Sequence, residues 1–279
     1  MGRGSVGNLC RDSLMEKYLM PLFWSSNDYE LMHNMSAVMC VFSFTIFVAF
    51  GFLPAPYGRY SSTSIGFRIN GRLSWIIQEI PSFAVPFLVY VYTDRVMLAV
   101  SYPNKILLSL FLLHYFQRTL IFPWLLQGTK PSPILISLFA FLFCTYNGFL
   151  QSYYLINVAL YPVSWYNDIR FISGILLFFV GMVINIHSDH VLRNLRKPGE
   201  TDYKIPYGGA FNYVSGANYF GEIVEWWGFG IACWSFCAIS FALFSTLFLG
   251  WRACHHHVFY LDKFEDYPKS RKALIPFIL

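Results

Sequence analysis

Polar and ionisable side chains recur at helical spacing in two stretches that are otherwise apolar enough to cross a membrane. One set ends the first stretch and the other begins the second: Asn185, Asp189, Arg193 and Arg196, and then Asn218, Glu222 and Glu225. Residues three or four apart share one face of a helix, so each set forms a polar stripe. Ionisable groups at bilayer depth persist mainly where they face a bundle interior or a watery cavity. The two stripes predict an intramembrane pocket for a charged, hydrogen-bonding ligand, which favours an enzyme or a transporter.

A basic loop, residues 193–209, follows the first stripe and contains a Pro-Gly turn and a Gly-Gly pair. Such a loop either clamps phosphate groups or contacts lipid headgroups. Asn185 and Asp189 favour phosphate binding, because a lipid-contacting loop needs no amide and carboxylate deeper on the same helical face. For Glu222 and Glu225 two roles stay open: they bind ligand hydroxyls and amides, or they tie helices together through Arg or Asn partners.

A single carboxyl group, that of Glu79, lies inside another apolar stretch, and the next stretch carries Tyr115 and Arg118 one helical turn apart. In apolar surroundings a carboxyl group tends to stay protonated and can then donate a hydrogen bond. Glu79 and Tyr115 could thus form a pair of donors aimed at a substrate oxygen. The alternative is an interhelical ion pair between Glu79 and Arg118, and both readings stay open.

The clustered histidines, at 255–257 and at 187 and 190, do not predict a metal site. Consecutive helical residues point in different directions, so the three neighbours cannot reach one ion, and at most one of them should face a pocket. The HExxH spacing of zinc helices is absent, no GxGxxG follows a predicted strand, and there is no Walker A or GxSxG motif. Any nucleotide site must therefore be built from helices.

The composition is that of an integral membrane protein. Apolar residues make up 56% of the 279 positions and charged residues only 13%, about half the share found in soluble domains. Aromatic residues reach 20%, which suits a lipid-facing surface and interfacial belts. The net charge of +5 resides in a few loops and the C-terminal tail, so no nucleic-acid partner is expected. The six cysteines show no secreted spacing, and reduced core thiols are the expected state.

Charge-free windows, together with weaker spans near 75–93 and 104–126, predict an all-α membrane protein with seven transmembrane helices. The last apolar region, about 217–250, is too long for one crossing. We expect Gly228 and Gly230 to break it into a short helix and a longer one.

The uneven distribution of Lys and Arg predicts the orientation. With seven spans, loops one, three and five and the C-terminus share one side and carry most of the cations. This places the C-terminus in the cytoplasm and the N-terminus outside. We expect an N-terminal extension without a cleavable signal, a transmembrane catalytic domain and a cytoplasmic segment that packs on the cofactor side, at 1–34, 35–258 and 259–279.

Six sequence blocks resemble the steroid 5-alpha-reductases (3-oxo-5-alpha-steroid 4-dehydrogenases), and within that family the mammalian type 2 branch. The blocks are QEIPSFAVP at 78–86, HYFQRT at 114–119, GMVINIHSD at 181–189, LRKPGE at 195–200, YVSGANYFGE at 213–222 and FEDYPKSRKALIP at 264–276. Blocks of this length are specific, unlike a single short motif. The resemblance extends from about residue 75 to the end, and residues 1–55 match poorly.

The resemblance implies a seven-helix membrane fold that holds NADPH between the later helices and the cytoplasmic loops. The positions that it assigns to the cofactor are Asn185, Asp189, Arg196, Tyr203, Asn218, Glu222, His256 and Tyr260, and we expect Arg252 to join them. Lys130 and Lys204 stand where the type 2 enzyme has arginine. A lysine keeps the charge for a phosphate but not the bidentate geometry.

The resemblance also implies the reaction, which is NADPH-dependent reduction of the Δ4 double bond of a 3-oxo-Δ4 steroid by hydride transfer to C5. Gln78, Glu79 and Tyr115 match the positions that the family assigns to the 3-keto end of the steroid, and they are the expected catalytic residues. Further substrate contacts are expected from Arg118, Phe143, Glu225 and Trp226.

Three other functions stay open: a trans-2-enoyl-CoA reductase, a membrane methyltransferase of the isoprenylcysteine type, and a non-enzymatic lipid or sterol transporter. An acyl-CoA should need more basic cytoplasmic surface than a steroid, and a methyltransferase would need no equivalent of the Glu79 and Tyr115 pair. The expected partners are a steroid and membrane lipid, without a metal ion or nucleic acid, and the expected state is a monomer. The membrane is the endoplasmic reticulum in a eukaryote or the inner membrane in a bacterium.

Overall fold

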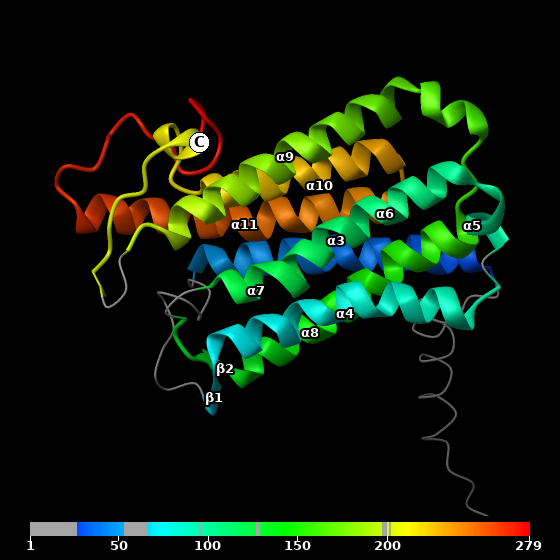
Figure 1. The fold of residues 1–279 in the computed structure, drawn as a ribbon, viewed down its shortest axis with the longest axis horizontal. Coiled ribbons are helices and arrows are strands. Elements are labelled where there is room, and N and C mark those ends of the chain that lie inside the picture. The colour runs from blue at the N-terminus through cyan, green and yellow to red at the C-terminus, as the bar shows by residue number, and fades with distance from the viewer. Residues whose placement is uncertain (1–26, 53–65, 95, 127–128, 197–199, 201) are drawn as a thin grey trace, which may run out of the picture.

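The computed structural model describes residues 27–52, 66–94, 96–126, 129–196, 200 and 202–279, which form a bundle of long helices (Figure 1). The long helices are α3 (Asp28–Phe52), α4 (Gly71–Tyr92), α6 (Tyr102–Phe116), α8 (Ile134–Tyr153), α9 (Ile169–Arg193), α10 (Ala217–Cys233) and α11 (Phe236–Lys263). The shorter helices are α5 (Val96–Val100), α7 (Phe122–Leu125), the π-helices η3 (Gln117–Ile121) and η4 (Tyr154–Val158), and the 3-10 helices η5 (Val163–Asn167) and η6 (Gly209–Asn212). Two strands, β1 (Arg68–Ile69) and β2 (Ser132–Pro133), pair antiparallel at one end of the bundle.

Six helical segments among the described residues are long and apolar enough to cross a membrane, which agrees with the predicted class of all-α membrane protein. Two of them are composite: α6 continues through η3 and α7, and α8 continues through η4. The shorter helix α10, with 17 residues, is not among the six. Helix α3 begins inside the segment predicted as the N-terminal extension, and α11 continues past the predicted end of the transmembrane domain.

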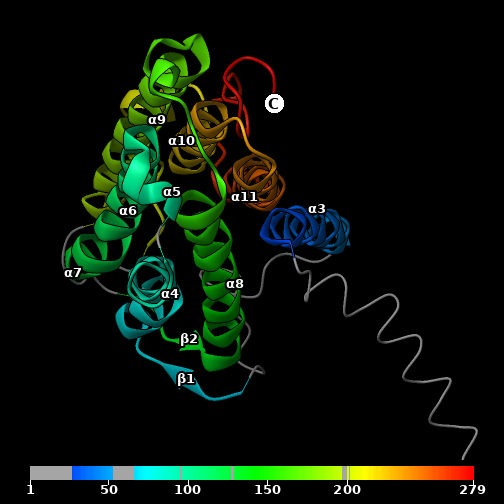
Figure 2. The same ribbon diagram turned by 90° about the vertical axis from the view of Figure 1, so that its right-hand side faces the viewer.

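The order of the helices around the bundle is visible end-on (Figure 2). Helices α9, α10, α11 and α3 follow one another on one side, and α8, α4 and α6 complete the other side. The most extensive contact between described helices joins α9 to α10, and the next joins α4 to α8. The two helices that carry the polar stripes are therefore packed directly against each other.

The break in the last apolar region differs from the prediction. Gly228 and Gly230 lie inside α10, and the chain turns only at Trp234, which adopts a left-handed conformation with φ of 46° and ψ of 43°. Ser235 then caps α11, its hydroxyl accepting a hydrogen bond from the Ala238 amide at 3.3 Å. Tryptophan rarely adopts the left-handed conformation, so the local sequence does not predict a turn at this position.

Glycines spaced two helical turns apart line the contact between α9 and α10. They are Gly174 and Gly181 on α9, and Gly221 and Gly228 on α10. A Cβ atom at any of the four would collide with backbone atoms of the facing helix. The absent side chains let the two backbones approach closely, as small residues do in membrane bundles. Gly228 therefore acts as a packing residue rather than as a helix break.

Two aromatic side chains satisfy the carbonyl groups at the C-terminal end of α10. The Tyr161 hydroxyl donates to the Cys233 carbonyl at 2.5 Å, and the Trp165 indole donates to the Ala232 carbonyl at 3.1 Å. Burial raises the pKa of Tyr161 well above its ordinary value, so the phenol stays protonated as a donor. The end of α10 needs no water to complete these hydrogen bonds.

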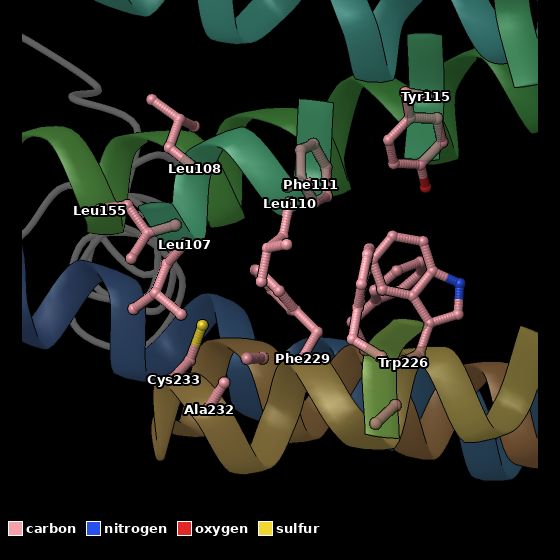
Figure 3. Close-up of a cluster of buried hydrophobic side chains, with 14 of the residues drawn as sticks. Leu107, Leu108, Leu110, Phe111, Tyr115, Leu155, Trp226, Phe229, Ala232 and Cys233 are labelled. Atoms are coloured by element: carbon pink, nitrogen blue, oxygen red, sulfur yellow. The ribbon is translucent and has the colours of Figure 1, made fainter. Parts of the chain in front are cut away.

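The largest buried apolar cluster joins α6 to α10 and α11 (Figure 3). Phe111 on α6 lies against Trp226 and Phe229 of α10, with ring centroids 5.9 Å and 6.0 Å away. Phe241 of α11 meets the Trp226 ring at 4.5 Å. This core fixes α6, which carries Tyr115, relative to the helices of the polar stripes.

Candidate functional site

Arg118 is the centre of a buried polar cluster between α4, α7, α9 and α10. Its Nη1 donates to Asp189 Oδ2 at 2.8 Å, and its Nη2 lies 3.8 Å from Glu222 Oε2. The guanidinium is also within 4.7 Å of the Trp75 ring centroid and 4.4 Å of the Phe122 centroid. Only 7% of Arg118 is exposed, so water screens its ion pairs and its cation–π contacts only weakly.

The π-helix η3 contains Arg118 and follows directly after the helix that carries Tyr115. A π-helical turn is wide, and such turns are frequent at functional sites. The Trp75 indole N–H donates to the Arg118 carbonyl at 3.1 Å, which helps to satisfy the backbone of this turn. Arg118 thus pairs with Asp189 and Glu222 in the described structure, rather than with Glu79 as one reading of the sequence suggested.

The two polar stripes meet across the glycine contact of α9 and α10. Asn185 Nδ2 donates to the Asn218 carbonyl at 2.9 Å and lies 3.4 Å from Glu222 Oε2. With Asp189 and Arg118, these side chains form one connected set. The structure therefore brings together Asn185, Asp189, Asn218 and Glu222, four of the residues that the sequence assigned to a cofactor.

A second buried pair, His114 and Glu225, was not found from the sequence. His114 Nδ1 lies 2.8 Å from Glu225 Oε1, and the His114 ring lies 4.5 Å from the Trp226 ring centroid. Glu225 Oε2 has no hydrogen-bond partner among the described residues. His114 precedes Arg118 by one helical turn, and that spacing was the available signal. The expected substrate contacts Glu225 and Trp226 are 0% and 1% exposed, so here they pack as walls of the site.

Of the expected catalytic residues, Glu79 and Tyr115 lie on neighbouring helices, and Gln78 is hydrogen-bonded elsewhere. Glu79 on α4 is half-buried, and Tyr115 on the neighbouring α6 is buried. Gln78 Nε2 instead donates to Ser74 Oγ at 2.6 Å and lies 3.4 Å from Ser137 Oγ of α8. Gln78 therefore contributes to the contact between α4 and α8.

The cations expected to bind phosphate gather around Tyr203. Lys130 Nζ donates to the Tyr203 hydroxyl at 3.5 Å, and the Arg196 guanidinium lies 5.0 Å from the Tyr203 ring centroid. Lys204 forms an ion pair with Glu200 in the same loop. These side chains come from loops at the end of the bundle that also holds the sheet and the C-terminal segment (Figure 1).

The expected cofactor residues of α11 surround a second tyrosine. Arg252 donates to the Tyr219 hydroxyl from Nε at 3.1 Å and from Nη2 at 3.0 Å, and His256 Nε2 lies 3.2 Å from the same oxygen. Tyr260 is buried and stacks on Tyr267, with ring centroids 5.3 Å apart. Arg252 and His256 are thereby tied to the first turn of α10, next to Asn218.

The remaining predicted contact, Phe143, belongs to an aromatic stack between α8 and α11. Its ring centroid lies 4.1 Å from that of Phe244, which in turn stacks on Phe42 of α3 at 5.9 Å. Within the described residues there is no group of three His, Cys, Asp or Glu side chains that could hold a metal ion.

Replacing Arg118 with Met is expected to destabilise the folded protein by about 3–5 kcal/mol, because the change leaves Asp189 and Glu222 as buried carboxylates without their cation. Thermal unfolding in detergent would measure the loss. Adding Asp189→Asn to Arg118→Met should recover part of it, since one unpaired charge is then removed. An unfolding temperature equal to that of the wild type would contradict this account of the cluster.

The chain matches proteins of known activity over most of its length. A family model described as 3-oxo-5-alpha-steroid 4-dehydrogenase matches residues 130–279, more than half of the chain. The rat 3-oxo-5-alpha-steroid 4-dehydrogenase 1 is 56% identical over 225 residues, which are 81% of this chain and 86% of the relative. The bovine 3-oxo-5-alpha-steroid 4-dehydrogenase 1 is 49% identical over 250 residues, 89% and 97% of the two chains.

The human 3-oxo-5-alpha-steroid 4-dehydrogenase 2 is 53% identical over 227 residues, 81% of this chain and 88% of the relative. Relatives of both types thus match at similar identity, and the identities do not single out the type 2 branch. They favour neither an enoyl-CoA reductase nor a methyltransferase. The chain belongs to the 3-oxo-5-alpha-steroid 4-dehydrogenase family.

Proposed function

We propose that this protein reduces the Δ4 double bond of 3-oxo-Δ4 steroids to the 5α-reduced 3-oxo products, with NADPH as the hydride donor. The observation that carries the proposal is the placement of Glu79 and Tyr115 on the neighbouring helices α4 and α6 inside an apolar bundle, with the polar cluster of Arg118 one turn beyond Tyr115. Two hydrogen-bond donors in a water-poor site suit a carbonyl oxygen that becomes negative during reaction. The apolar surroundings suit a flat, apolar substrate.

A count of charges supports a neutral, donating Glu79. The carboxyl groups that interact in this region are Glu79, Asp189, Glu222 and Glu225. The cationic candidates beside them among the described residues are Arg118, His114 and Arg193. Arg118 and His114 are paired with Asp189, Glu222 and Glu225, and Arg193 lies near Asp189, so three cations face four carboxyl groups. An ionised Glu79 would lack an ion-pair partner of its own, and an unpaired charge inside an apolar bundle costs several kcal/mol. We therefore assign Glu79 the protonated form, in which its hydroxyl can donate.

The roles of the residues follow from the proposed reaction. When bound, NADPH supplies the hydride that adds to C5 of the steroid. Negative charge then develops on the C3 oxygen, and Glu79 and Tyr115 stabilise it by donating hydrogen bonds worth about 3 kcal/mol each. Uptake of a proton at C4 restores the 3-oxo group and completes the reduction. The buried aromatic side chains around Tyr115 exclude water, which strengthens both hydrogen bonds.

The residues on the cofactor side fit the charge pattern of NADPH. Ser188 Oγ and Arg193 Nη1 are buried donors without a hydrogen-bond partner among the described residues, so they are available to a ligand. Arg196 and Lys130 add cations that can form charge-assisted hydrogen bonds to phosphate. We propose that the cofactor is held by Lys130, Asn185, Asp189, Arg196, Tyr203, Lys204, Asn218, Glu222, Arg252, His256 and Tyr260.

Arg196→Ala is expected to raise the KM for NADPH about tenfold or more, because a charge-assisted hydrogen bond to phosphate is lost. The KM for the steroid should stay within about twofold of the wild-type value, since Arg196 lies outside the proposed steroid site. Lys105→Ala, which removes a cation from the first turn of α6 at the opposite end of the bundle, is the matched control. Equal changes in the two variants would contradict the phosphate role.

Purified protein in detergent tests the proposed reaction directly. We expect NADPH oxidation that depends on testosterone or progesterone, with the 5α-reduced steroid identified by mass spectrometry. NADPH binding without reduction of either steroid would contradict the substrate assignment, and a trans-2-enoyl-CoA would then be assayed in its place. If NADPH does not bind at all, the reductase mechanism fails as a whole.

We further propose that α10 is a seventh crossing, so that the N-terminus lies outside and the C-terminus in the cytoplasm. Support comes from where the helices end: α7, α9 and α11 all end at the side of the bundle that carries the basic loops (Figure 1). Residues 1–34, 35–258 and 259–279 then act as extension, catalytic domain and cytoplasmic segment. The protein would act as a monomer, in the endoplasmic reticulum if its source is eukaryotic and in the inner membrane if bacterial.

A further inference from the structure

Two amide side chains of α8 are buried beside Tyr115. Asn147 and Gln151 stand one helical turn apart and are 0% and 1% exposed. Their side-chain hydrogen bonds within the described structure run to each other, to Tyr115 and to a backbone carbonyl, and none of these partners is charged. Amides inside an apolar bundle are costly unless they are hydrogen-bonded, so a pair of them at the active-site tyrosine calls for an explanation.

The direction of this hydrogen-bond chain is set at its far end by the backbone. Gln151 Nε2 lies 2.8 Å from the Cys237 carbonyl, which can only accept, so the amide nitrogen must face it. The same nitrogen donates to Asn147 Oδ1 at 3.2 Å. Because Asn147 Oδ1 accepts from Gln151, Asn147 Nδ2 faces the Tyr115 hydroxyl oxygen, 3.5 Å away. Gln151 therefore donates to both the Cys237 carbonyl and Asn147, and Asn147 donates to the Tyr115 hydroxyl.

This chain of hydrogen bonds determines the direction in which the Tyr115 hydroxyl points its single proton. Its oxygen accepts from Asn147, so the O–H bond is directed away from α8 and towards the other neighbours of Tyr115, among them α4, the helix that carries Glu79 and Ser82. Figure 3 shows this hydroxyl pointing away from α6 on the side of Trp226. Hydrogen bonds in a chain polarise one another, so a tyrosine that accepts from an amide is also a better donor.

We propose that Asn147 and Gln151 are positioning residues, which orient the Tyr115 hydroxyl as a donor to the 3-oxo group of the substrate. This inference rests on the proposed function, because it assumes that Tyr115 donates to the steroid. Neither amide touches the substrate in this account. Without Asn147 the hydroxyl is free to rotate, and part of the preorganisation that stabilises the developing oxyanion is lost.

A double-mutant cycle tests the proposal in the full-length protein. Asn147→Leu keeps the size of the side chain and removes both hydrogen-bonding groups. We expect it to lower kcat about tenfold in the wild-type background and less than about twofold in the Tyr115→Phe background, where no hydroxyl is left to orient. The dissociation constant of NADPH, followed by fluorescence, should not change in either background. Ser152→Ala, which removes a buried side chain of α8 bonded only within its own helix, should leave kcat unchanged.

The outcomes separate this proposal from the function on which it rests. Equal losses of kcat in both backgrounds would mean that Asn147 acts through packing, and the positioning role would be overturned. If Tyr115→Phe itself leaves kcat unchanged, the role of Tyr115 fails first. Should Asn147→Leu not fold, Gln151→Met interrupts the same chain one link further away. It is expected to lower kcat several-fold only when Tyr115 is present, and a loss in the Tyr115→Phe background would again overturn the proposal.

Discussion

Glu79→Gln is expected to lower kcat for a 3-oxo-Δ4 steroid by about a hundredfold to a thousandfold, while the dissociation constant of NADPH stays within about twofold. A carboxylic acid is a stronger hydrogen-bond donor than the amide that replaces it, and the C3 oxygen needs the stronger donor only when it becomes negative. The loss should therefore appear in turnover rather than in cofactor binding. Steady-state kinetics and NADPH fluorescence on the same preparation measure both quantities.

The matched control is Glu222→Gln, the same substitution at a carboxyl group of the neighbouring cluster. Glu222 lies between Arg118 and Asn185, and we propose that it contacts the cofactor. Glu222→Gln should weaken NADPH binding at least as much as it lowers turnover. If Glu79→Gln gave equal losses of turnover and NADPH binding, the oxyanion role of Glu79 would be wrong.

Gly221→Ala is expected to destabilise the folded protein by about 1–3 kcal/mol, and Gly221→Val should prevent folding. The added Cβ would collide with the backbone nitrogen and Cα of Asn185 on α9, and backbone atoms of a packed helix cannot move aside cheaply. Separation of the two helices would also pull Asn185 away from Asn218. Size-exclusion chromatography after heating, with NADPH binding on the same samples, measures both effects.

Gly230→Ala is the control on the same helix. The nearest atoms to a Cβ at Gly230 lie 3.7 Å away, which is ordinary van der Waals contact. Since alanine is favoured over glycine inside a helix by up to about 1 kcal/mol, this variant should be as stable as the wild type or more so. A Gly221→Ala protein with wild-type stability would show that the helices do not pack as described.

The sequence was sufficient to predict the helical membrane class and the two polar stripes. Asn185, Asp189, Asn218 and Glu222 could be grouped because charged and amide residues are conspicuous in apolar stretches and because helical periodicity states which of them share a face. Their connection across α9 and α10 followed once the helices were placed. Periodicity alone does not say which helices are neighbours.

The sequence placed the break in the last apolar region at Gly228 and Gly230, and this prediction was wrong for a physical reason. Glycine lowers helix propensity in isolation, but Gly228 is held in α10 by the close approach of α9. The real turn uses Trp234 in a left-handed conformation, whose cost must be offset by contacts far away in the sequence. Those contacts include Arg170, whose guanidinium lies between the Trp165 and Trp234 rings at 4.5 Å and 5.1 Å from their centroids.

The residue pairs that the sequence did not predict depend on segments that are far apart along the chain. His114 and Glu225 are on α6 and α10, and no local pattern connects them. Asn147 and Gln151 lie in a span without any Asp, Glu, Lys or Arg, so no charged residue on the same face marks them as part of a site. Their importance depends on the Cys237 carbonyl and the Tyr115 hydroxyl, which only the folded chain brings within reach.

The end of α10 at which the aromatic residues Tyr161 and Trp165 lie bears on which compartment supplies NADPH to the reaction. Tyr161 and Trp165 saturate the last carbonyls of that helix, and Arg170 is held between the indoles beside them. With α10 oriented as proposed, this end faces the lumen or the exterior, whereas Asn218 and Glu222, proposed to hold the cofactor, lie at the other end of the same helix. Reducing equivalents would then be drawn solely from the cytosolic pool, so the redox state of the compartment across the membrane would have no influence on steroid turnover.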